Sequence, residues 1–586
     1  MSVVNNMTIK IGGEAGMGVA SNGAGLTKAL ARAGLHVFSI EDYMSRIRGG
    51  HNFFQIRASE KPVYCHSAPV HLLLAFTKEA VDAHHGEIVP GGGVVVDEGI
   101  KFDEKRLLDR GVKIFRMPLV SIAKNVGGSE LMMNTAAVAA AVGATQLDLR
   151  YVSEVIEENF GRRKGAPIAE ANLKVARAAY DMAAERYGAD FEFRLEARDS
   201  PRRMVVNGNE ALCLGTLSAG CKVVAGYPMT PTSTIIEFMA QQADRYGLVV
   251  RQTEDEIAGI LTVIGAAHAG VRAMTATSGG GFSLMTEALG MAGMTETPIV
   301  VVEGQRTGPS TGFPTRTEQG DLEFVMHASQ GEFPRIVLAP ATHEQCFEIG
   351  IRAFNLAERY QCPVILLTDL NMARALRDVP PEAFDIENAE INRGELLTYE
   401  DLDKLTGRYL RHALTETGIS HRAIPGHPKA VFMTDSDEHG PEGHIIEDAD
   451  TRTAMMNKRM KKLELAKRDM NGPMLYGPEK AEMTLMGWGS TYGALREAVD
   501  MLRERGASAN LVHFTDLWPV NEARVAEHIE SARRLVAVEN NYSAQWASVV
   551  RRCTGISAHG KVVKYDGRPF APEDVLAGLE KVANAA

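Results

Sequence analysis

The chain has 586 residues, of which 45% are hydrophobic and 23% charged, and its formal net charge at pH 7 is −11. That length exceeds what one hydrophobic core normally supports, so we expect three or four domains. An acidic chain lacks the basic surface of a general nucleic-acid-binding protein, and no apolar run approaches the ~20 residues that span a bilayer. Nothing at the amino terminus resembles a secretory signal, so we expect a cytoplasmic protein.

The six cysteines are widely spaced, and none forms a C-x-x-C pair. They are Cys65, Cys213, Cys221, Cys346, Cys362 and Cys553. Iron–sulfur and structural zinc sites usually take several thiolates from short spacings. We therefore expect reduced, buried thiols and no metal cluster in this chain.

Residues 1–190 begin with a predicted strand, a glycine turn and an alanine-rich helix. The turn, GGEAGMGV (12–19), places Gly13, Gly16 and Gly18 where backbone N–H groups at a helix start can hold an anion. The glycines do not follow the G-x-G-x-x-G order of a dinucleotide site, which argues against a nicotinamide cofactor. An equally good interpretation is a tight turn that allows close strand–helix packing.

A second loop, SRIRGGHN (45–52), combines two arginines with paired glycines. Arg46 and Arg48 beside Gly49 and Gly50 would suit phosphate or pyrophosphate, although surface arginines are usually only solvated. Residues 1–190 form the first predicted domain, and the charged segment 191–203 is predicted to be a linker.

Three further regions follow. Residues 204–375 alternate apolar strands with glycine- and alanine-rich helices, which indicates a parallel α/β sheet. Residues 376–475 lose this alternation and contain a basic predicted helix (455–470), which we interpret as part of a solvated connector, with docking as the alternative. Residues 476–586 return to an α/β pattern.

The central region carries three polar segments, each of which has an ordinary structural explanation. In GYPMTPTS (226–233), Thr230 lies between two prolines, and Thr232 or Ser233 is best explained as a helix N-cap. In RQTEDEIAG (251–259), acids precede a helix and could be electrostatic caps. In the segment 304–322, Arg306 and a Gly-Pro-Ser-Thr loop follow a predicted strand, where ligands bind in open parallel sheets.

Taken in order, these segments resemble one family. YPMTP (227–231), TATSGGGFSLM (275–285) and LTDLNMA (367–373) are similar to motifs in the pyrimidine-binding domain of 2-oxoacid:ferredoxin oxidoreductases. Residues 1–190 resemble the gamma domain of that family, and 476–586 resemble a transketolase carboxy-terminal domain. The resemblance implies a multidomain α/β protein with a gamma-type domain, a doubly wound thiamine-diphosphate-binding domain of the pyrimidine type and a transketolase-like α/β domain.

The same resemblance implies roles for particular residues. Glu256 matches the glutamate that bonds the aminopyrimidine ring of thiamine diphosphate, and a dry cleft would strengthen that contact. Thr230 and Arg306 match residues that bind the 2-oxoacid carboxylate. Further substrate contacts are expected from Ser310 and Thr311, cofactor contacts from Tyr227, Pro228, Thr277, Ser278, Gly279 and Gly280, and coenzyme A or phosphate contacts from Gly13, Gly16, Gly18, Arg46, Arg48, Gly49 and Gly50.

The sequence has no GDG motif followed by paired asparagines, which would hold diphosphate and Mg²⁺. The family resemblance therefore implies a beta subunit that carries the diphosphate, Mg²⁺ and a [4Fe–4S] cluster, in an (alpha–beta)2 heterotetramer. Asn540 and Gln545 could face the active site, or they could be buried polar packing.

The implied activity is reversible, coenzyme A-dependent oxidative decarboxylation of a 2-oxoacid, with electrons passed to ferredoxin. 2-Oxoglutarate, giving succinyl-CoA, is the preferred substrate, and the reverse reaction would fix CO₂ as in a reductive TCA cycle. Pyruvate and branched-chain 2-oxoacids remain alternatives. Two other hypotheses stay open: a non-redox thiamine-dependent decarboxylase, and a coenzyme A-binding or scaffold subunit with vestigial catalytic residues.

Overall fold

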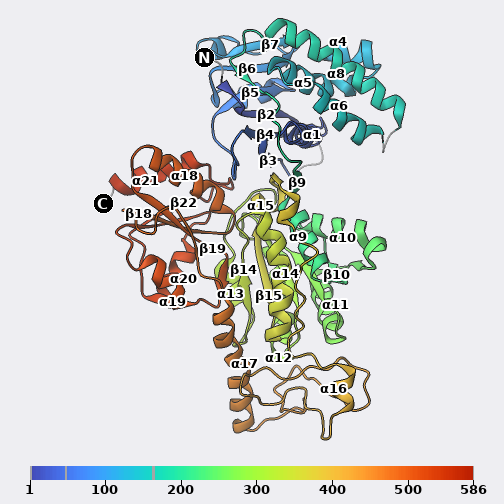
Figure 1. Cartoon of the computed structure of the whole chain (residues 1–586), viewed down its shortest axis with the longest axis vertical. Helices are drawn as coiled ribbons and strands as arrows, with labels where there is room; N and C mark the ends of the chain where they lie inside the picture. The colour runs from blue at the N-terminus through green and yellow to red at the C-terminus, as the bar shows by residue number, and fades with distance from the viewer. Residues whose placement is uncertain (1–2, 46–48, 162–164, 585–586) are drawn as a thin grey trace. The chain divides into compact units, whose positions relative to one another are not determined.

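The computed structural model describes residues 3–45, 49–161 and 165–584, and the chain divides into two compact units (Figure 1). The first unit comprises Met1–Asn207 with the short segments Arg374–Ala383 and Ala571–Glu573, and the second comprises the remainder. Within the described ranges, no helix is both long and apolar enough to cross a membrane. The predicted multidomain α/β fold is confirmed.

An eight-stranded sheet organises the first unit. Its strands, in spatial order, are β7 (Lys113–Met117), β6 (Ile88–Asp97), β5 (Val70–Ala75), β2 (Asn6–Glu14), β4 (His51–Ser59), β3 (His36–Asp42), β16 (Leu376–Val379) and β9 (Met204–Asn207). A separate parallel pair joins β1 (Val3–Val4) to β8 (Phe193–Arg194). Strand β16 lies far along the chain and pairs antiparallel with both β3 and β9, so a short segment after the central region completes this sheet.

Successive side chains of a strand point to opposite faces of the sheet, so the two faces of this sheet are covered by different hydrophobic cores. Leu72 and Leu74 pack into the larger core with helices α1 (Val19–Arg32), α4 (Leu119–Gly127), α5 (Met133–Ala144), α6 (Arg150–Ile156) and α8 (Ala166–Tyr187). Leu73 and Ala75 face the opposite way, into a smaller core with α2 (Lys78–His84) and α3 (Lys105–Leu108). Figure 1 shows α4, α5, α6 and α8 grouped together. A 3₁₀ turn, η1 (Glu130–Met132), precedes α5, and a π-helical turn, η2 (Glu157–Gly161), follows α6.

The second unit is built on a seven-stranded sheet. Its order is β11 (Val249–Gln252), β10 (Val223–Gly226), β12 (Ala273–Thr277), β13 (Val300–Gln305), β15 (Val364–Asp369), β14 (Ile336–Leu338) and β20 (Asp516–Trp518). All but β20 are parallel. The helices in this part of the chain are α9 (Gly208–Ser218), α10 (Ser233–Tyr246), α11 (Glu256–His268), α12 (Gly279–Met294), α13 (Leu322–His327), α14 (His343–Tyr360) and α15 (Leu370–Arg374). This parallel sheet confirms the α/β pattern predicted for residues 204–375.

A five-stranded sheet follows in the same unit. It orders β17 (Met474–Tyr476), β19 (Ala509–Phe514), β18 (Met483–Trp488), β21 (Leu535–Glu539) and β22 (Gly560–Val563), with α18 (Tyr492–Glu504), α19 (Glu522–Ile529), α20 (Gln545–Thr554) and α21 (Pro572–Asn584) in the same stretch. Strand β20 leaves this region to pair antiparallel with β14. Trp488 and Trp546 share one core with residues of the central sheet such as Val301, so the two sheets are packed together.

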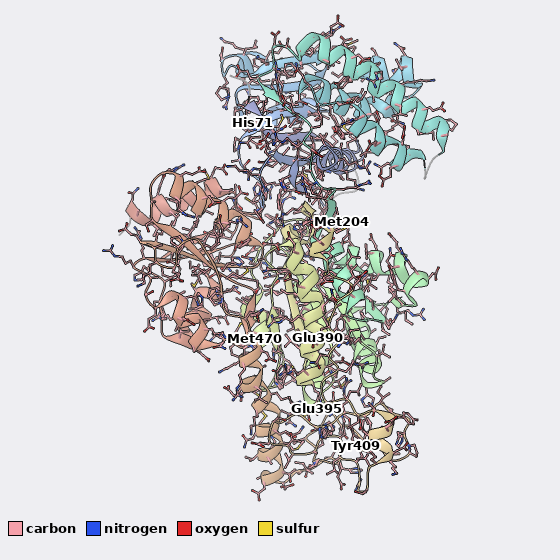
Figure 2. The ribbon with its side chains drawn as sticks, in the orientation of Figure 1. His71, Met204, Glu390, Glu395, Tyr409 and Met470 are labelled. Atoms are coloured by element: carbon pink, nitrogen blue, oxygen red, sulfur yellow. The ribbon has the colours of Figure 1, made fainter. Side chains whose placement is uncertain are left out.

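The irregular region predicted after residue 376 has a small core of its own. After β16, which belongs to the first sheet, it contains two short elements, η3 (Pro381–Ala383) and α16 (Tyr399–Asp403), before the long helix α17 (Ala449–Asp469). Tyr409, labelled in Figure 2, packs with Leu402 and Ala423, and its hydroxyl donates to the carbonyl of His421 while accepting from the Ala423 amide. Backbone–side-chain bonds therefore replace regular secondary structure here.

One face of α17 is buried rather than solvated, which corrects the expectation for this basic helix. Lys458 and Lys462 both donate to the carboxylate of Glu296, at the turn that follows α12, and His412 Nδ1 lies 3.0 Å from the same carboxylate. Burial alone would raise the pKa of Glu296, but the two ammonium groups hold it well below its usual range. Burial lowers the pKa of Lys458 to about 7. The sequence pattern showed the charges of α17 but not their partner.

We expect Glu296→Gln to loosen α17. The substitution leaves two buried ammonium groups without a counter-charge, and breaking a buried ion pair in this way costs about 3–5 kcal/mol. The measurement is amide hydrogen exchange along α17, together with thermal unfolding. Glu464→Gln is the matched control, because this exposed acid on the same helix forms only a surface pair with Lys467. Equal loss of protection in the two variants would contradict the prediction.

Candidate active site

Three loops meet at the carboxyl edge of the central sheet. Strands β10, β12 and β13 are consecutive parallel neighbours, and they are followed by Thr230, Ser278 and Arg306 respectively. The carboxyl ends of neighbouring parallel strands form one edge, which is where open α/β sheets bind ligands. The sheet therefore gathers residues that are separated by up to about 80 positions in the chain.

Glu256 is a buried carboxylate without a complete set of hydrogen bonds. It opens α11, directly after Asp255, whose side chain caps the helix by accepting from the Ala258 amide at 2.8 Å. Glu256 is 4% exposed, and among the described residues its Oε1 has no hydrogen-bond partner. Asp255 therefore has a structural explanation, whereas Glu256 is an acceptor that the fold leaves unsatisfied.

The Glu256 carboxylate lies against the first turn of α12. A Cβ atom added at Gly281 would come within 2.6 Å of Glu256 Oε1 and 2.1 Å of Thr277 Oγ1. Neither contact is sterically tolerable, so glycine is required at this position. At Gly280, by contrast, an added Cβ would meet nothing within 4 Å.

Thr230 and Arg306 are in direct contact. Arg306 Nη1 donates to the backbone carbonyl of Thr230 at 3.0 Å, and both residues are half-buried. The predicted N-cap in this loop is only partly right. Helix α10 does begin at Ser233, but the Thr232 hydroxyl donates to the Met229 carbonyl at 3.0 Å instead of capping the helix.

The remaining predicted cofactor residues differ in exposure. Thr277 and Ser278 are completely buried, and the Ser278 hydroxyl has no hydrogen-bond partner in the described part of the chain. Tyr227 and Pro228 are exposed, as is Gly280, and Gly279 is half-buried. A buried, unpaired hydroxyl and an unpaired carboxylate in neighbouring segments are suited to a polar ring that has both donor and acceptor atoms.

Ser310 and Thr311 lie at the tip of an exposed loop. The loop is closed by a bridge between Thr307 and Phe313, with the Phe313 amide donating to the Thr307 carbonyl at 3.0 Å. Among the described residues, no hydrogen bond joins either hydroxyl to Thr230 or Glu256. The structure brings Thr230 and Arg306 together and leaves Ser310 and Thr311 on the surface.

Two acids near this edge were missed by the sequence analysis: Glu303, which is fully buried, and Asp321, which is half-buried. Glu303 lies inside β13, and Asp321 precedes α13. A Cβ atom added at Gly279 would lie 2.6 Å from Asp321 Oδ2. Asp321 therefore approaches the same turn of α12 that Glu256 approaches at Gly281. The available signal was a single acid at the end of the apolar run VVVE (300–303).

The glycine loop of the first unit divides into positions with different roles. A Cβ at Gly13 would touch Phe76 at 3.1 Å, which fits the packing interpretation. Gly16 has a φ of +93° and open space around it, and Gly18, with a φ of +71°, precedes α1. Gly49 and Gly50 also have positive φ values. The predicted contacts Arg46 and Arg48 lie outside the described residues.

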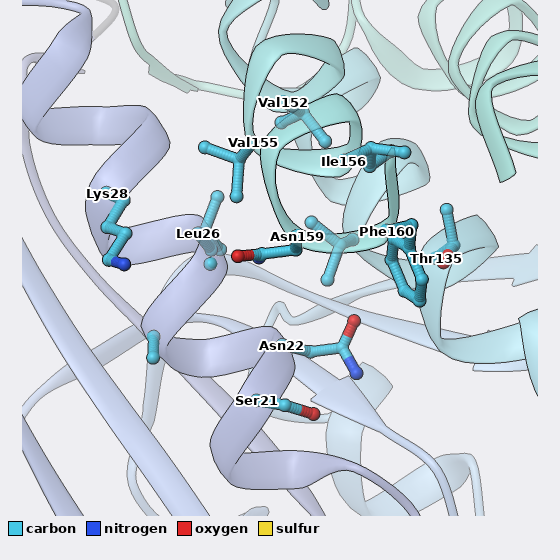
Figure 3. A pocket seen from close by; sticks show the side chains of 13 residues that line it. Ser21, Asn22, Leu26, Lys28, Thr135, Val152, Val155, Ile156, Asn159 and Phe160 are labelled. Atoms are coloured by element: carbon cyan, nitrogen blue, oxygen red, sulfur yellow. The ribbon is translucent and has the colours of Figure 1, made fainter. Parts of the chain in front are cut away.

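A cavity of about 430 Å³ lies beside α1 in the first unit (Figure 3). The lining comes from α1, α5, α6 and η2, and comprises Ser21, Asn22, Ala24, Gly25, Leu26, Lys28, Thr135, Val138, Val152, Val155, Ile156, Asn159 and Phe160. Asn22 is tied to the preceding glycine loop, because its side-chain amide donates to the Gly18 carbonyl at 2.8 Å. The cavity therefore adjoins the predicted anion-binding turn, and no sequence motif indicated it.

The described part of the chain contains free cysteines and no cluster of potential metal ligands. All six cysteines are free thiols, five of them are buried, and Cys553 is partly exposed. No group of three or more His, Cys, Asp or Glu side chains among the described residues could hold a metal ion.

Asn540 and Gln545 hold the segment that carries Asp321. The backbone N–H of Gln319 donates to the backbone carbonyl of Asn540 at 2.7 Å. The side chain of Gln545 donates to the backbone carbonyl of Gly320 at 2.6 Å and accepts from the backbone N–H of Glu323 at 3.0 Å. The alternative of buried polar packing is thus the better description, although the packing supports a loop at the candidate site.

Comparison with protein-family models gives three adjacent matches. Pyruvate ferredoxin/flavodoxin oxidoreductase matches residues 8–182, the thiamine diphosphate-binding model of pyruvate flavodoxin/ferredoxin oxidoreductase matches 214–458, and core domain II of pyruvate:ferredoxin oxidoreductase matches 481–575. These matches follow the order of the regions described above.

Individual relatives match over nearly the whole chain. A 2-oxoacid:ferredoxin oxidoreductase alpha subunit from Sulfolobus sp is 32% identical, covering 98% of this chain and 96% of the relative. The 2-oxoglutarate oxidoreductase subunit KorA of Mycobacterium tuberculosis is 30% identical, covering 98% and 91%. The solved 2-oxoglutarate:ferredoxin oxidoreductase of Magnetococcus marinus, with 2-oxoglutarate, coenzyme A and succinyl-CoA bound, has a TM-score of 0.92 at 32% identity, covering 99% of each chain.

We expect Gly281→Ala to reduce turnover of a 2-oxoacid by at least about tenfold. The added methyl group overlaps Glu256 and Thr277, and a displacement of about 1 Å at a reacting group can cost about a hundredfold in rate. The measurement is steady-state dye reduction by the assembled complex. Gly280→Ala is the control, since it makes the same change one residue away in open space. Similar losses in both variants would mean that helix flexibility, and not the Glu256 contact, matters.

Proposed function

Because the chain belongs to the family of 2-oxoacid:ferredoxin oxidoreductase alpha subunits, we propose that it oxidatively decarboxylates 2-oxoglutarate to succinyl-CoA and CO₂. Two electrons pass one at a time to ferredoxin, coenzyme A takes the acyl group, and the reaction runs in either direction. The observation that carries the proposal is Glu256, a buried carboxylate with an unpartnered oxygen, on the same sheet edge as the Arg306–Thr230 contact.

In this proposal, different residues of the chain bind the cofactor and the substrate. Glu256 holds the aminopyrimidine ring of thiamine diphosphate, with Thr277, Ser278, Gly279 and Gly280 close to the ring and Tyr227 and Pro228 at its margin. When bound, thiamine diphosphate supplies the nucleophilic carbon that adds to the oxo group. Arg306 and Thr230 receive the substrate carboxylate, for which a guanidinium provides both charge and orientation. Ser310 and Thr311 reach the substrate only if their exposed loop closes over it.

The proposed complex needs a partner for the remaining chemistry. A beta subunit supplies the diphosphate and Mg²⁺ site and the [4Fe–4S] cluster, in an (alpha–beta)2 heterotetramer. The absence of a GDG…NN sequence and of closely spaced cysteines in this chain supports that division. We place coenzyme A at the glycine loops of the first unit, where Gly16 and Gly18 precede α1. Free cysteine thiols fit a reducing compartment, so we place the complex in the cytoplasm.

The choice of 2-oxoglutarate rests on the relatives. Both the M. tuberculosis relative and the M. marinus structure carry 2-oxoglutarate in their names, whereas the family models are named for pyruvate. A panel of 2-oxoglutarate, pyruvate and branched-chain 2-oxoacids, assayed with the purified complex, decides between them. Release of CO₂ without reduction of ferredoxin or a viologen dye would favour a non-redox decarboxylase.

We expect Glu256→Gln to abolish 2-oxoacid-dependent reduction of a viologen dye while the complex still assembles. Glutamine keeps the volume of the side chain but removes the carboxylate that activates the cofactor ring. Dye reduction and size-exclusion chromatography are the two measurements. Glu254→Gln, an exposed acid two residues earlier, should retain wild-type turnover. Near-normal turnover of the Glu256 variant would remove this residue from the mechanism.

Arg306→Ala is expected to raise KM for the 2-oxoacid by roughly tenfold to a hundredfold, because a charge-assisted contact to a carboxylate is lost. Arg251→Ala, at an exposed arginine on the strand β11, is the control for a general loss of positive charge. An unchanged KM in the Arg306 variant would place carboxylate binding elsewhere.

A further inference from the structure

Glu303 is a carboxyl group that the fold has buried without a donor. It lies in β13, between Val302 and Gly304, and none of its surface is exposed. No N–H or O–H group among the described residues donates to either of its oxygens. An ionised carboxylate in that position would lack both solvent and counter-donors, which is among the most costly arrangements in a protein interior.

The group that faces Glu303 is a second carboxyl, that of Asp321, within side-chain hydrogen-bonding reach. Two ionised carboxylates are both acceptors, so they form a hydrogen bond only when one of them holds a proton. The position of Asp321 is fixed by its backbone amide, which donates to Gln305 Oε1 at 3.0 Å, and by its approach to Gly279. The pair is therefore held together by the fold.

Three further charged groups surround the pair: one that follows Glu303, one that precedes Asp321, and one at the end of a neighbouring strand. Arg306, one residue beyond β13, attracts both carboxylates, while Asp369 at the end of β15 repels Glu303. Burial raises the pKa of Glu303 well above its usual range and the pKa of Asp321 to about 6. Glu318, whose pKa burial and Asp321 raise to about 7, is a further acid beside Asp321, and Glu256 approaches the same turn of α12 as Asp321. Glu303, Asp321 and Glu318 titrate as a coupled set, and the proton belongs to the pair.

We propose that Glu303 and Asp321 form a proton-sharing pair that positions Arg306 and keeps its charge available to the carboxylate of the substrate. The inference rests on the proposed function, in which Arg306 binds that carboxylate. With one proton shared, the pair presents one negative charge to Arg306. With the proton lost, the pair presents two, and this added negative charge opposes the binding of an anionic substrate. Glu303 and Asp321 are positioning residues, because both act through Arg306.

Loss of the shared proton should lower the affinity for the 2-oxoacid, because it adds a negative charge near the substrate carboxylate. At an effective dielectric constant of about 20, an additional unit charge about 10 Å from a carboxylate weakens its binding by roughly tenfold. The effect falls on KM, since the pair does not touch the reacting atoms in the proposal. KM for the 2-oxoacid should therefore rise as the pH increases and the shared proton leaves.

The test compares the complete alpha–beta complex with its Glu303→Gln variant. Glutamine has nearly the same shape and supplies a permanent N–H donor to Asp321, so the pair carries one negative charge throughout the neutral to alkaline range. KM for 2-oxoglutarate is measured from neutral to alkaline pH. The wild type should show a rise of roughly tenfold in KM rather than in kcat, and the variant a flat KM. Glu287→Gln, an exposed acid on α12, should keep the wild-type pH profile.

Two results of this experiment would overturn the proposal: a wild-type KM that does not change with pH, or a Glu303→Gln variant whose KM follows the wild-type profile. A role in packing alone would lower the stability of the variant without changing the shape of its pH profile.

A second measurement does not need turnover. The infrared difference spectrum between the wild-type and Glu303→Gln complexes at neutral pH should contain a C=O stretch of a protonated carboxyl group that the variant has lost. Absence of that band contradicts the pair. If the complex turns over no 2-oxoacid but the band is present, the proposed function fails and the proton-sharing pair stands.

Discussion

The first turn of α12 begins with three glycines, Gly279, Gly280 and Gly281, and two acids, one buried and one half-buried, occupy the space that side chains would fill. Glu256 reaches the turn at Gly281, and Asp321 reaches it at Gly279. Because neither position tolerates a Cβ atom without displacing a carboxylate, the glycines fix where both acids lie. The candidate site is therefore built around a helix start, which is a favourable place for negative charge.

The five-stranded sheet contributes to the same arrangement. The segment that begins at Gln319 is hydrogen-bonded to Asn540, Asn541 and Gln545, at and after the end of β21. These bonds fix the backbone on either side of Asp321, whose own amide is bonded to Gln305 on β13. Strand β20 and a common hydrophobic core already hold the two sheets together. The carboxy-terminal region therefore also holds the loop that carries Asp321, an acid of the candidate site.

Two buried glutamates show how partners decide the charge of an interior acid. Glu296 and Glu303 are both fully buried, and they lie seven positions apart in the chain. Glu296 accepts from two lysines, and its pKa is held low. Glu303 meets another carboxyl and no donor among the described residues, and its pKa is raised. Burial is common to both, so the opposite directions come from their neighbours.

The sequence by itself determined the α/β class, the start of α10 at Ser233 and the family resemblance, because periodicity, prolines and motif order are local properties of the chain. It also identified Glu256, Thr230 and Arg306 as candidates. Only the tertiary structure paired Glu303 with Asp321, buried Lys462 against Glu296 and returned β16 to the first sheet. These features depend on which side chains approach one another across 18 to more than 300 positions of chain, and local spacing carries no record of such distances.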